Sequence, residues 1–392
     1  MVRGVKMEDW IYVTRSSMPP LKSNVRYLYD LWKNRHLPNQ GEQYEELQRA
    51  LAMELGVTHI TLTANGHLAI ELALNALGCT GEVITTPFTA ATTTQAIINS
   101  GCTPVFCDID LAAWTLDVSK IESLITPKTS AILAVHVFGR ICNVEQIDAI
   151  AKKHNLRVIY DAAHAYKVKV NDEPISKFGH CTIFSLHASK LFHAVEGGVL
   201  ATNDVALAKQ FTLLQNIGHT DKSGFNAKMS EFHAAMGLCA IDYVDGWIAK
   251  RKELFEYYVD QLKVVEGLSI PSLQPNVTTN YSYFPILLDG NREGLIAYLK
   301  EHQIGTLKYS LTSSIVSTGD VGPDNRLMEK SSTSVAKWVA DRVLCMPLYT
   351  DLTFEQIDKI CACIKVFVRM TSLPNGLGQA HLDVVTKEIT TG

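Results

Sequence analysis

Short β-branched hydrophobic runs alternate with amphipathic stretches from about residue 57 to residue 201. Runs without a polar face are typical of strands covered on both sides, whereas an apolar residue at every third or fourth position is typical of a helix. The alternation predicts βαβ units and a mostly parallel sheet flanked by helices. The expected strands are VTHITL, EVITT, PVFCDI, AILAVHVF, LRVIYD, TIFSL and GGVLAT, and the expected helices between them are HLAIELALNALG, ATTTQAIINSG, SKIESLI and VEQIDAIAKKH.

After residue 203 the pattern becomes helical, until Pro271 and Pro275 interrupt it. A strand, NYSYFPILLD, and two helices, REGLIAYLKEHQI and FEQIDKICACIKVF, then predict a smaller C-terminal α+β domain. The fold class is therefore α/β with a second, smaller domain. We expect an N-terminal segment at 1–25, a large domain at 26–265, a small domain at 266–371 and a loosely held extension at 372–392.

The composition mainly excludes classes of protein. The 392 residues are 47% hydrophobic and 19% charged, as in ordinary globular enzymes. A net charge of −4 provides no basic surface for nucleic acid. No apolar run reaches the roughly 18 residues that span a membrane, and the first residues lack the apolar core of a signal peptide, so we expect a cytoplasmic protein.

The nine cysteines are scattered along the chain without a CxxC pair. Cys361 and Cys363 lie in a stretch with helical periodicity, where they serve as small apolar side chains. We expect reduced, buried thiols and neither a disulfide nor a metal site.

Candidate chemistry is found where strands end, because ligands of open parallel sheets bind outside the carboxyl ends of the strands. In TANGHLAIELAL, Gly66 lies where a strand leads into a helix, and free N–H groups at a helix N-terminus bind anions. An ordinary turn capped by Asn65 explains the same residues.

Two further strand ends carry side chains that could contact a ligand. Phe88 in TTPFTAATT could form a platform for a planar ring, although a phenylalanine in a loop more often serves packing. Asp161 ends the strand VIYD and is followed by His164. A carboxylate at that position needs a partner or solvent, and helix capping is the structural alternative.

Lys190 lies in the apolar segment FSLHASKLFHAVEGG. Desolvation lowers the pKa of a lysine amine and makes the amine a nucleophile, whereas a surface lysine is the ordinary alternative. Ser185 precedes it at the end of the strand TIFS, and His187 and His193 flank it without an evident role.

Together these clusters contain the parts of a pyridoxal phosphate site. Lys190 supplies an amine for the cofactor aldehyde, and Asp161 supplies a carboxylate that keeps the pyridine nitrogen protonated. Phe88 would cover the ring face, and the N–H groups near Gly66 would hold the phosphate.

The ordered motifs NGHLAI, VITTPFTAATT, PVFCDID, IYDAAHA, SLHASK and GFNAKMSEFHAAMGL resemble the DegT-like nucleotide-sugar aminotransferases of pyridoxal phosphate fold type I. The resemblance covers roughly residues 10 to 370. Within the family, YVTRSSMPP together with NGHLAI and TTPFT is most similar to enzymes that aminate C4 of dTDP-4-dehydro-6-deoxy-D-glucose. Their product is dTDP-4-amino-4,6-dideoxy-D-glucose (viosamine).

The resemblance assigns roles by matching positions. Lys190 matches the Schiff-base lysine and Asp161 the partner of the pyridine nitrogen. Phe88 matches the aromatic residue that stacks on the ring, and His164 stands beside the cofactor hydroxyl. Ser185 matches a serine that binds the phosphate.

Gly66 and His67 align with a Gly-Thr pair whose N–H groups hold the phosphate, so the usual threonine hydroxyl is absent here. Asn226 matches an asparagine that reaches the phosphate of the neighbouring subunit, which implies a homodimer with shared active sites. Lys228 replaces a common arginine, and the chain reads KYSLTSS around Tyr309, where the family has Tyr-x-Pro-Leu-His. That second departure lies in the region expected to shape the sugar pocket.

The implied reaction is a ping-pong transamination from L-glutamate to the dTDP-4-keto sugar, with lipopolysaccharide O-antigen synthesis as the expected pathway. A sugar-nucleotide 3-aminotransferase would use the same cofactor residues and is the nearest alternative. A sugar 3-dehydratase of this fold carries histidine in place of the lysine, so Lys190 argues against that activity. A pyridoxal phosphate-binding regulatory protein without turnover is the alternative from another class.

Overall fold

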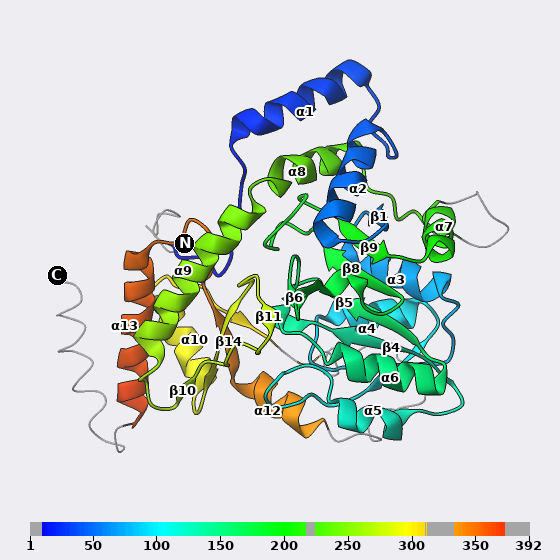
Figure 1. Ribbon diagram of the computed structural model, residues 1–392. Helices are drawn as coiled ribbons and strands as arrows, with labels where there is room; N and C mark the ends of the chain where they lie inside the picture. Colours follow the sequence, from blue (N-terminus) through cyan, green and yellow to red (C-terminus); the bar gives the residue numbers. More distant parts are fainter. Residues whose placement is uncertain (1–9, 217–223, 310, 312–332, 373–392) are drawn as a thin grey trace, which may run out of the picture.

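The computed structural model describes residues 10–216, 224–309, 311 and 333–372. Two domains lie side by side (Figure 1), with the large sheet on the right of the view and a smaller domain on the left. The helix α1 (Leu21–Asn34) projects at the top, above the helix α8 (Glu231–Ile241).

A seven-stranded sheet forms the centre of the large domain, in the order β1-β9-β8-β5-β4-β2-β3. Neighbouring strands from β8 to β3 run parallel, and only β9 is antiparallel to its neighbours β8 and β1. The predicted mostly parallel sheet is therefore confirmed. Its strands are β1 (His59–Thr63), β2 (Glu82–Thr85), β3 (Thr103–Phe106), β4 (Thr129–Val135), β5 (Arg157–Asp161), β8 (Cys181–Ser185) and β9 (Gly198–Thr202).

Helices cover both faces of this sheet, which is why its strands are hydrophobic throughout. Along β5, Tyr160 packs into the core on one face and Ile159 into the core on the other. The helices α2 (Glu42–Leu55), α6 (Val144–His154) and α8 contribute to the first core, and α3 (Gly66–Ala76), α4 (Ala91–Asn99), α7 (Val205–Leu214) and α12 (Ser334–Arg342) contribute to the second. A further helix, α5 (Val118–Leu124), places Ile121 in the first core.

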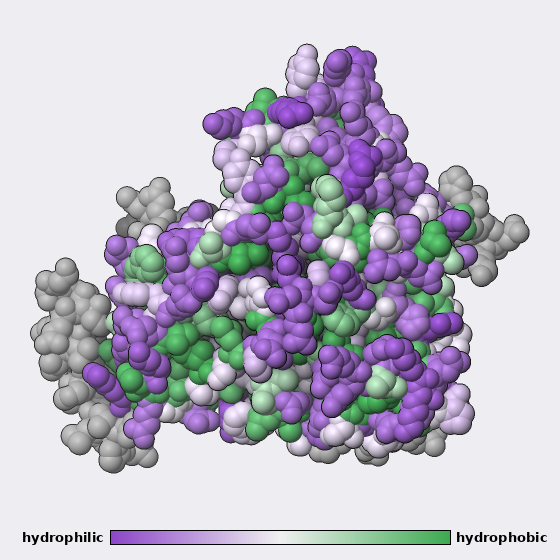
Figure 2. All heavy atoms as spheres, in the orientation of Figure 1, coloured by the Kyte–Doolittle hydropathy of each residue, from purple (hydrophilic) through white to green (hydrophobic). Residues whose placement is uncertain are grey.

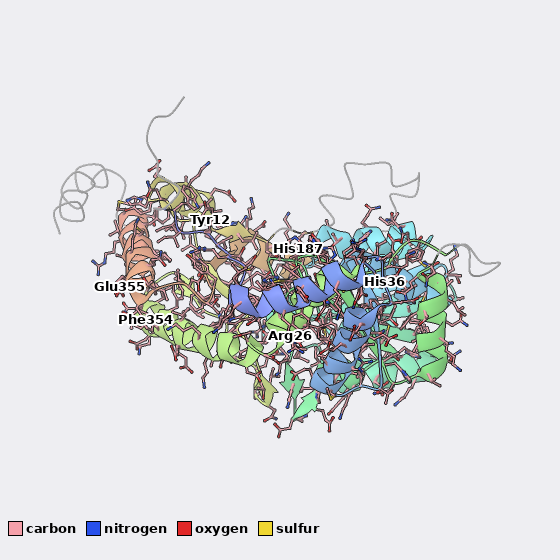
Figure 3. All side chains as sticks on the ribbon, turned by 90° about the horizontal axis from the view of Figure 1, so that it is seen from above. Tyr12, Arg26, His36, His187, Phe354 and Glu355 are labelled. Atoms are coloured by element: carbon pink, nitrogen blue, oxygen red, sulfur yellow. The ribbon has the colours of Figure 1, made fainter. Side chains whose placement is uncertain are left out.

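The small domain is built on an antiparallel sheet in the order β10-β12-β14-β13. These strands are β10 (Leu268–Ser269), β12 (Phe284–Leu288), β13 (Leu307–Lys308) and β14 (Val343–Met346). Three helices pack with the sheet around one core: α9 (Val244–Leu262), α10 (Arg292–Glu301) and α13 (Phe354–Ser372). Figure 3 shows Phe354 and Glu355 at the start of α13, and the ring of Phe354 lies 4.9 Å from that of Tyr257 in α9. The predicted smaller α+β domain is confirmed.

The helix α9 joins the two domains. Val244, at its start, belongs to a large-domain core, whereas Leu254, Tyr258 and Leu262 belong to the small-domain core. The helix thus passes from the large-domain core to the small-domain core between Val244 and Leu254, before the predicted domain boundary at residue 265.

The N-terminal part holds structure that the sequence pattern did not predict. The expected segment 1–25 ends inside α1, and Ile11 pairs with Ile304 in the small domain.

A three-stranded sheet of β6 (Lys169–Val170), β7 (Glu173–Pro174) and β11 (Val277–Thr278) was also not predicted. Of the predicted extension 372–392, Ser372 ends α13 and residues 373–392 lie outside the described part.

All nine cysteines are free, their expected burial is confirmed, and Cys361 and Cys363 lie in α13. Among the described residues, no group of three or more histidine, cysteine or acidic side chains is placed to hold a metal ion. No helix in the described ranges is both long and apolar enough to cross a membrane.

Candidate active site

A cavity of about 370 Å³ lies at the carboxyl ends of the parallel strands. This volume falls within the range of small-molecule and cofactor pockets. Six of the eight predicted site residues line it: Gly66, His67, Asp161, His164, Ser185 and Lys190. They come from α3, from the ends of β5 and β8, and from the loops that follow these two strands.

Asp161 is the last residue of β5 and is 5% exposed. The hydroxyl of Thr93 donates to its Oδ2 at 2.8 Å, and the N–H of Ala163 donates to its Oδ1 at 3.1 Å. Burial raises the pKa of the carboxyl, whereas these two hydrogen bonds and the charge of Lys190 lower it. Each carboxylate oxygen thus has one donor and keeps room for another.

Lys190 lies in the loop between β8 and β9. Its backbone N–H donates to the carbonyl of His187 at 2.9 Å. Burial lowers the pKa of its amine, and the nearby Asp161 carboxylate partly offsets that shift. A lowered pKa increases the fraction of neutral amine, which is the nucleophilic form. Lys190 is therefore a partly buried amine that lines the cavity, and its lowered pKa favours the nucleophilic form.

His164 lies beside these two groups. Its Nδ1 accepts the N–H of Phe138 at 3.1 Å, and its ring stacks on that of Phe138 at 6.1 Å. Burial and the charge of Lys190 place the pKa of His164 well below its ordinary value, so the ring is neutral.

Gly66 and Ser185 meet at the start of α3. Asn65 caps this helix by accepting the N–H of Leu68 at 2.9 Å, and the first N–H groups of a helix have no partner within it. A Cβ at Gly66 would lie 3.2 Å from the Cβ of Ser185, so glycine keeps the space between the helix end and the serine open. The arrangement can hold a phosphate between backbone N–H groups and a hydroxyl.

The side chain of His67 turns away from this helix end. Its Nδ1 donates to the carbonyl of Thr92 at 2.9 Å, and its Nε2 lies 2.9 Å from Oε1 of Glu71. The imidazole thus has partners of its own, and the predicted phosphate contact of His67 would have to come from its backbone N–H.

Two predicted residues lie outside the lining. Phe88 is fully buried, and its ring packs edge-on against Trp114, Phe138 and Tyr309 at 5.1 to 6.4 Å. Its neighbours in the same loop, Thr89 and Ala90, line the cavity instead. The structure thus supports the packing interpretation of Phe88.

Asn226 is exposed and likewise does not line the cavity. The following residue, Ala227, accepts the N–H of Ala64 at 2.8 Å, next to the loop that leads into α3. Asn226 is therefore an exposed residue close to the start of α3 in its own chain.

Other lining residues were missed or set aside in the sequence. His136 directly follows β4, so the strand-end rule could have found it. His187 and Glu196 line the cavity and face each other at 3.6 Å, which corrects the view of His187 as a mere neighbour. The side chain of His187 is exposed. Tyr309 enters from the small domain, and no local pattern indicates that placement.

The sequence of residues 22–365 matches the DegT/DnrJ/EryC1/StrS aminotransferase family. The chain belongs to this family. It is 35% identical to dTDP-4-amino-4,6-dideoxy-D-glucose transaminase of Shigella dysenteriae, over 92% of this chain and 99% of the relative. It is 40% identical to the Escherichia coli protein of the same name, over 89% of this chain and 96% of the relative.

Among solved structures, that of DesI in the presence of its TDP-sugar product matches with a TM-score of 0.86 and 29% identity, over 92% of this chain and 93% of DesI. The expected fold and family are thereby confirmed. Members of the DegT/DnrJ/EryC1/StrS family are pyridoxal phosphate-dependent aminotransferases, as the resemblance implied. The cavity fits this cofactor, since it offers a partly buried amine, a buried carboxylate and a helix N-terminus that can bind an anion.

Proposed function

We propose that this aminotransferase transfers the amino group of L-glutamate to C4 of dTDP-4-dehydro-6-deoxy-D-glucose. The products are dTDP-4-amino-4,6-dideoxy-D-glucose and 2-oxoglutarate. The single observation that carries the chemistry is the placement of Lys190, Asp161 and His164 on one cavity with Gly66 and Ser185. The choice of sugar rests on the two relatives named as transaminases of this product.

Each residue has a separate task in this proposal. The amine of Lys190 would hold the aldehyde of the cofactor, and the free amine would accept the proton from Cα of glutamate on its Nζ. The carboxylate of Asp161 holds the proton on the pyridine nitrogen, and His164 donates its Nε2–H to the cofactor hydroxyl. The N–H groups of Gly66 and His67 and the hydroxyl of Ser185 hold the phosphate. The cofactor itself supplies the electron sink that makes the Cα proton removable.

The nearest alternative is amination at C3. A UDP-N-acetyl-3-dehydro-alpha-D-glucosamine 3-aminotransferase of Acidithiobacillus ferrooxidans is 30% identical over 83% of this chain, and the catalytic tasks above are the same for both positions. The higher identity to the C4 transaminases and the N-terminal resemblance favour C4. Use of the product in lipopolysaccharide O-antigen and a cytoplasmic location stay predictions.

We further propose a homodimer with shared active sites, in which Asn226 reaches the phosphate in the partner. An exposed apolar stripe on α1 supports a partner on this side of the molecule, because a solvated helix rarely exposes so many large apolar side chains. Its members, with 55 to 76% of each exposed, are Leu21, Val25, Tyr29 and Trp32. Figure 2 shows hydrophobic side chains gathered beneath the projecting α1.

The test is incubation of the purified protein with pyridoxal phosphate, L-glutamate and a panel of 3-keto and 4-keto dTDP-, UDP- and GDP-sugars. Mass identifies the aminated product, and the proton couplings at C3 and C4 identify the position and configuration of the new amine. The proposal expects amination of the dTDP-4-keto sugar at C4. A product aminated at C3 would replace it with the alternative, and formation of 2-oxoglutarate with no sugar amine would reject both.

A further inference from the structure

Two threonines of the TTPFTAATT loop connect to the buried carboxylate of the site. Thr89 and Thr93 are 2% and 1% exposed, and their hydroxyl oxygens lie 3.0 Å apart. Thr93 Oγ1 lies 2.8 Å from Oδ2 of Asp161. Thr93 is in the first turn of α4, so this helix fixes its position. Thr89 lies two residues before α4 begins, and its hydroxyl contacts that of Thr93 in the first turn.

The chemistry of the groups gives this chain of contacts a direction. An ionised carboxylate only accepts hydrogen bonds, so Thr93 donates its single proton to Asp161. The hydroxyl oxygen of Thr93 then accepts from Thr89. Hydrogen bonds in such a series polarise and strengthen one another.

We propose that Thr93 is a positioning residue for the reaction, which holds Asp161 ionised and oriented toward the pyridine nitrogen of the cofactor, with Thr89 reinforcing it. The inference rests on the proposed function. It adds to the proposed role of Asp161, which would contact the cofactor, a role for the hydroxyls of Thr93 and Thr89, which contact Asp161 directly and through Thr93. The TTPFTAATT motif then serves the site through Thr89 and Thr93, whereas Phe88 packs beside them.

The surroundings of Asp161 support an electrostatic effect of this hydroxyl. The titratable groups around it are Lys190, Tyr309, Cys142 and His164, of which His164 is neutral because burial lowers its pKa. Burial raises the pKa of the Tyr309 phenol and of the Cys142 thiol, so both are neutral near pH 7. Only Lys190 adds a charge, and that charge diminishes as its amine becomes neutral. The hydrogen bonds from Thr93 and Ala163 are then the main favourable interactions of the carboxylate.

The test compares Thr93→Val, which keeps the shape and removes the hydroxyl, with Thr93→Ser, which keeps the hydroxyl. Both are loaded with pyridoxal phosphate. Thr93→Val should slow the half-reaction with L-glutamate about 10- to 100-fold, the usual effect of losing a hydrogen bond to a charged group, while KM for glutamate changes little. Thr93→Ser should restore most of the rate.

A second readout separates this role from a structural one. In Thr93→Val the pKa of Asp161 rises, so the acid limb of the pH–rate profile and the acid transition in the visible absorbance of the bound cofactor both move to higher pH. Thr202→Val is the matched control: Thr202 is 2% exposed and donates to the carbonyl of His180, away from the cavity. It should lose stability without either change.

Thr89→Val should move the acid limb of the pH–rate profile and the acid transition in the cofactor absorbance to higher pH, by a smaller amount than Thr93→Val. If Thr93→Val does not fold, Thr89→Val tests the inference in its place. Rates and spectra of Thr93→Val equal to those of wild type would overturn the inference, as would an unchanged Thr89→Val where Thr93→Val does not fold. A wild-type protein that binds no pyridoxal phosphate would instead overturn the proposed function. The two failures are therefore distinguishable.

Discussion

The backbone N–H of Phe138 donates a 3.1 Å hydrogen bond to Nδ1 of His164. A neutral imidazole nitrogen that accepts a hydrogen bond has no proton, so the hydrogen-bond network assigns the proton of His164 to Nε2. Protonation of Nδ1 would place two donors face to face, and burial also disfavours the cation. His164 is thus a fixed donor that does not titrate in the working range.

This relationship predicts that His164→Gln, whose amide can both accept from Phe138 and donate, keeps the half-reaction with glutamate within about 10-fold of wild type. His164→Leu should lose about 10- to 100-fold, because both hydrogen bonds disappear. Stopped-flow absorbance of the loaded protein measures both rates. The acid limb of the pH–rate profile should be the same in wild type and His164→Gln. A limb that disappears with the substitution would show that His164 titrates.

A separate prediction concerns His136 and the change of the free energy of unfolding with pH. Burial lowers the pKa of this histidine to about 3, from roughly 6.5 in an unfolded chain. The unfolded state therefore binds a proton that the folded state excludes, and stability is lost as the pH falls from about 6.5 toward 3. The loss is about 1.4 kcal/mol per pH unit for one group.

His136→Asn keeps an acceptor for the N–H of Cys142, which donates to Nδ1 at 3.1 Å. Urea unfolding at pH 7 and pH 5 should therefore show that the free energy of unfolding falls by about 2 kcal/mol less in this variant than in wild type. The control is His36→Asn, at an exposed histidine after α1 (Figure 3), which should lose stability in parallel with wild type. Parallel behaviour of His136→Asn would mean that His136 becomes protonated in the folded protein.

The proposed shared site predicts complementation between two inactive variants. Lys190→Ala removes the amine from its own site, and Asn226→Ala removes a contact from the partner's site. When equal amounts are coexpressed and dimers form at random, half are mixed and each mixed dimer holds one intact site. Activity should return to about a quarter of the wild-type level. If coexpression gives only the sum of the two variants, Asn226 acts within its own chain or not at all.

Much of the fold followed from the sequence because the central strands are buried on both faces. VIY in β5 and ILA in β4 have no polar face, and this property is visible locally. The place of β9 between β8 and β1 was not predicted, because the pairing with β1 joins segments far apart in the chain. The helix α1 was not predicted either, and large apolar side chains along it are exposed rather than packed in a core.

The site was predictable to the extent that its residues end strands. Asp161 and Ser185 end β5 and β8, and the parallel arrangement brings them to one edge. The orientation of Phe88 was not predictable from the sequence. Whether its ring faces the cavity or the core depends on its packing against Trp114 and Phe138, which lie elsewhere in the chain. Tyr309 reaches the cavity from the small domain, and the distance along the chain hides that contact from local patterns.

The most direct test of the account is to find the lysine that binds the cofactor. The protein is loaded with pyridoxal phosphate, reduced with borohydride so that the bond between amine and cofactor becomes permanent, digested and analysed by peptide mass. The account predicts one modified site, at Lys190, with no modification and no transamination in Lys190→Ala. Modification at another lysine, or turnover by Lys190→Ala, would contradict it.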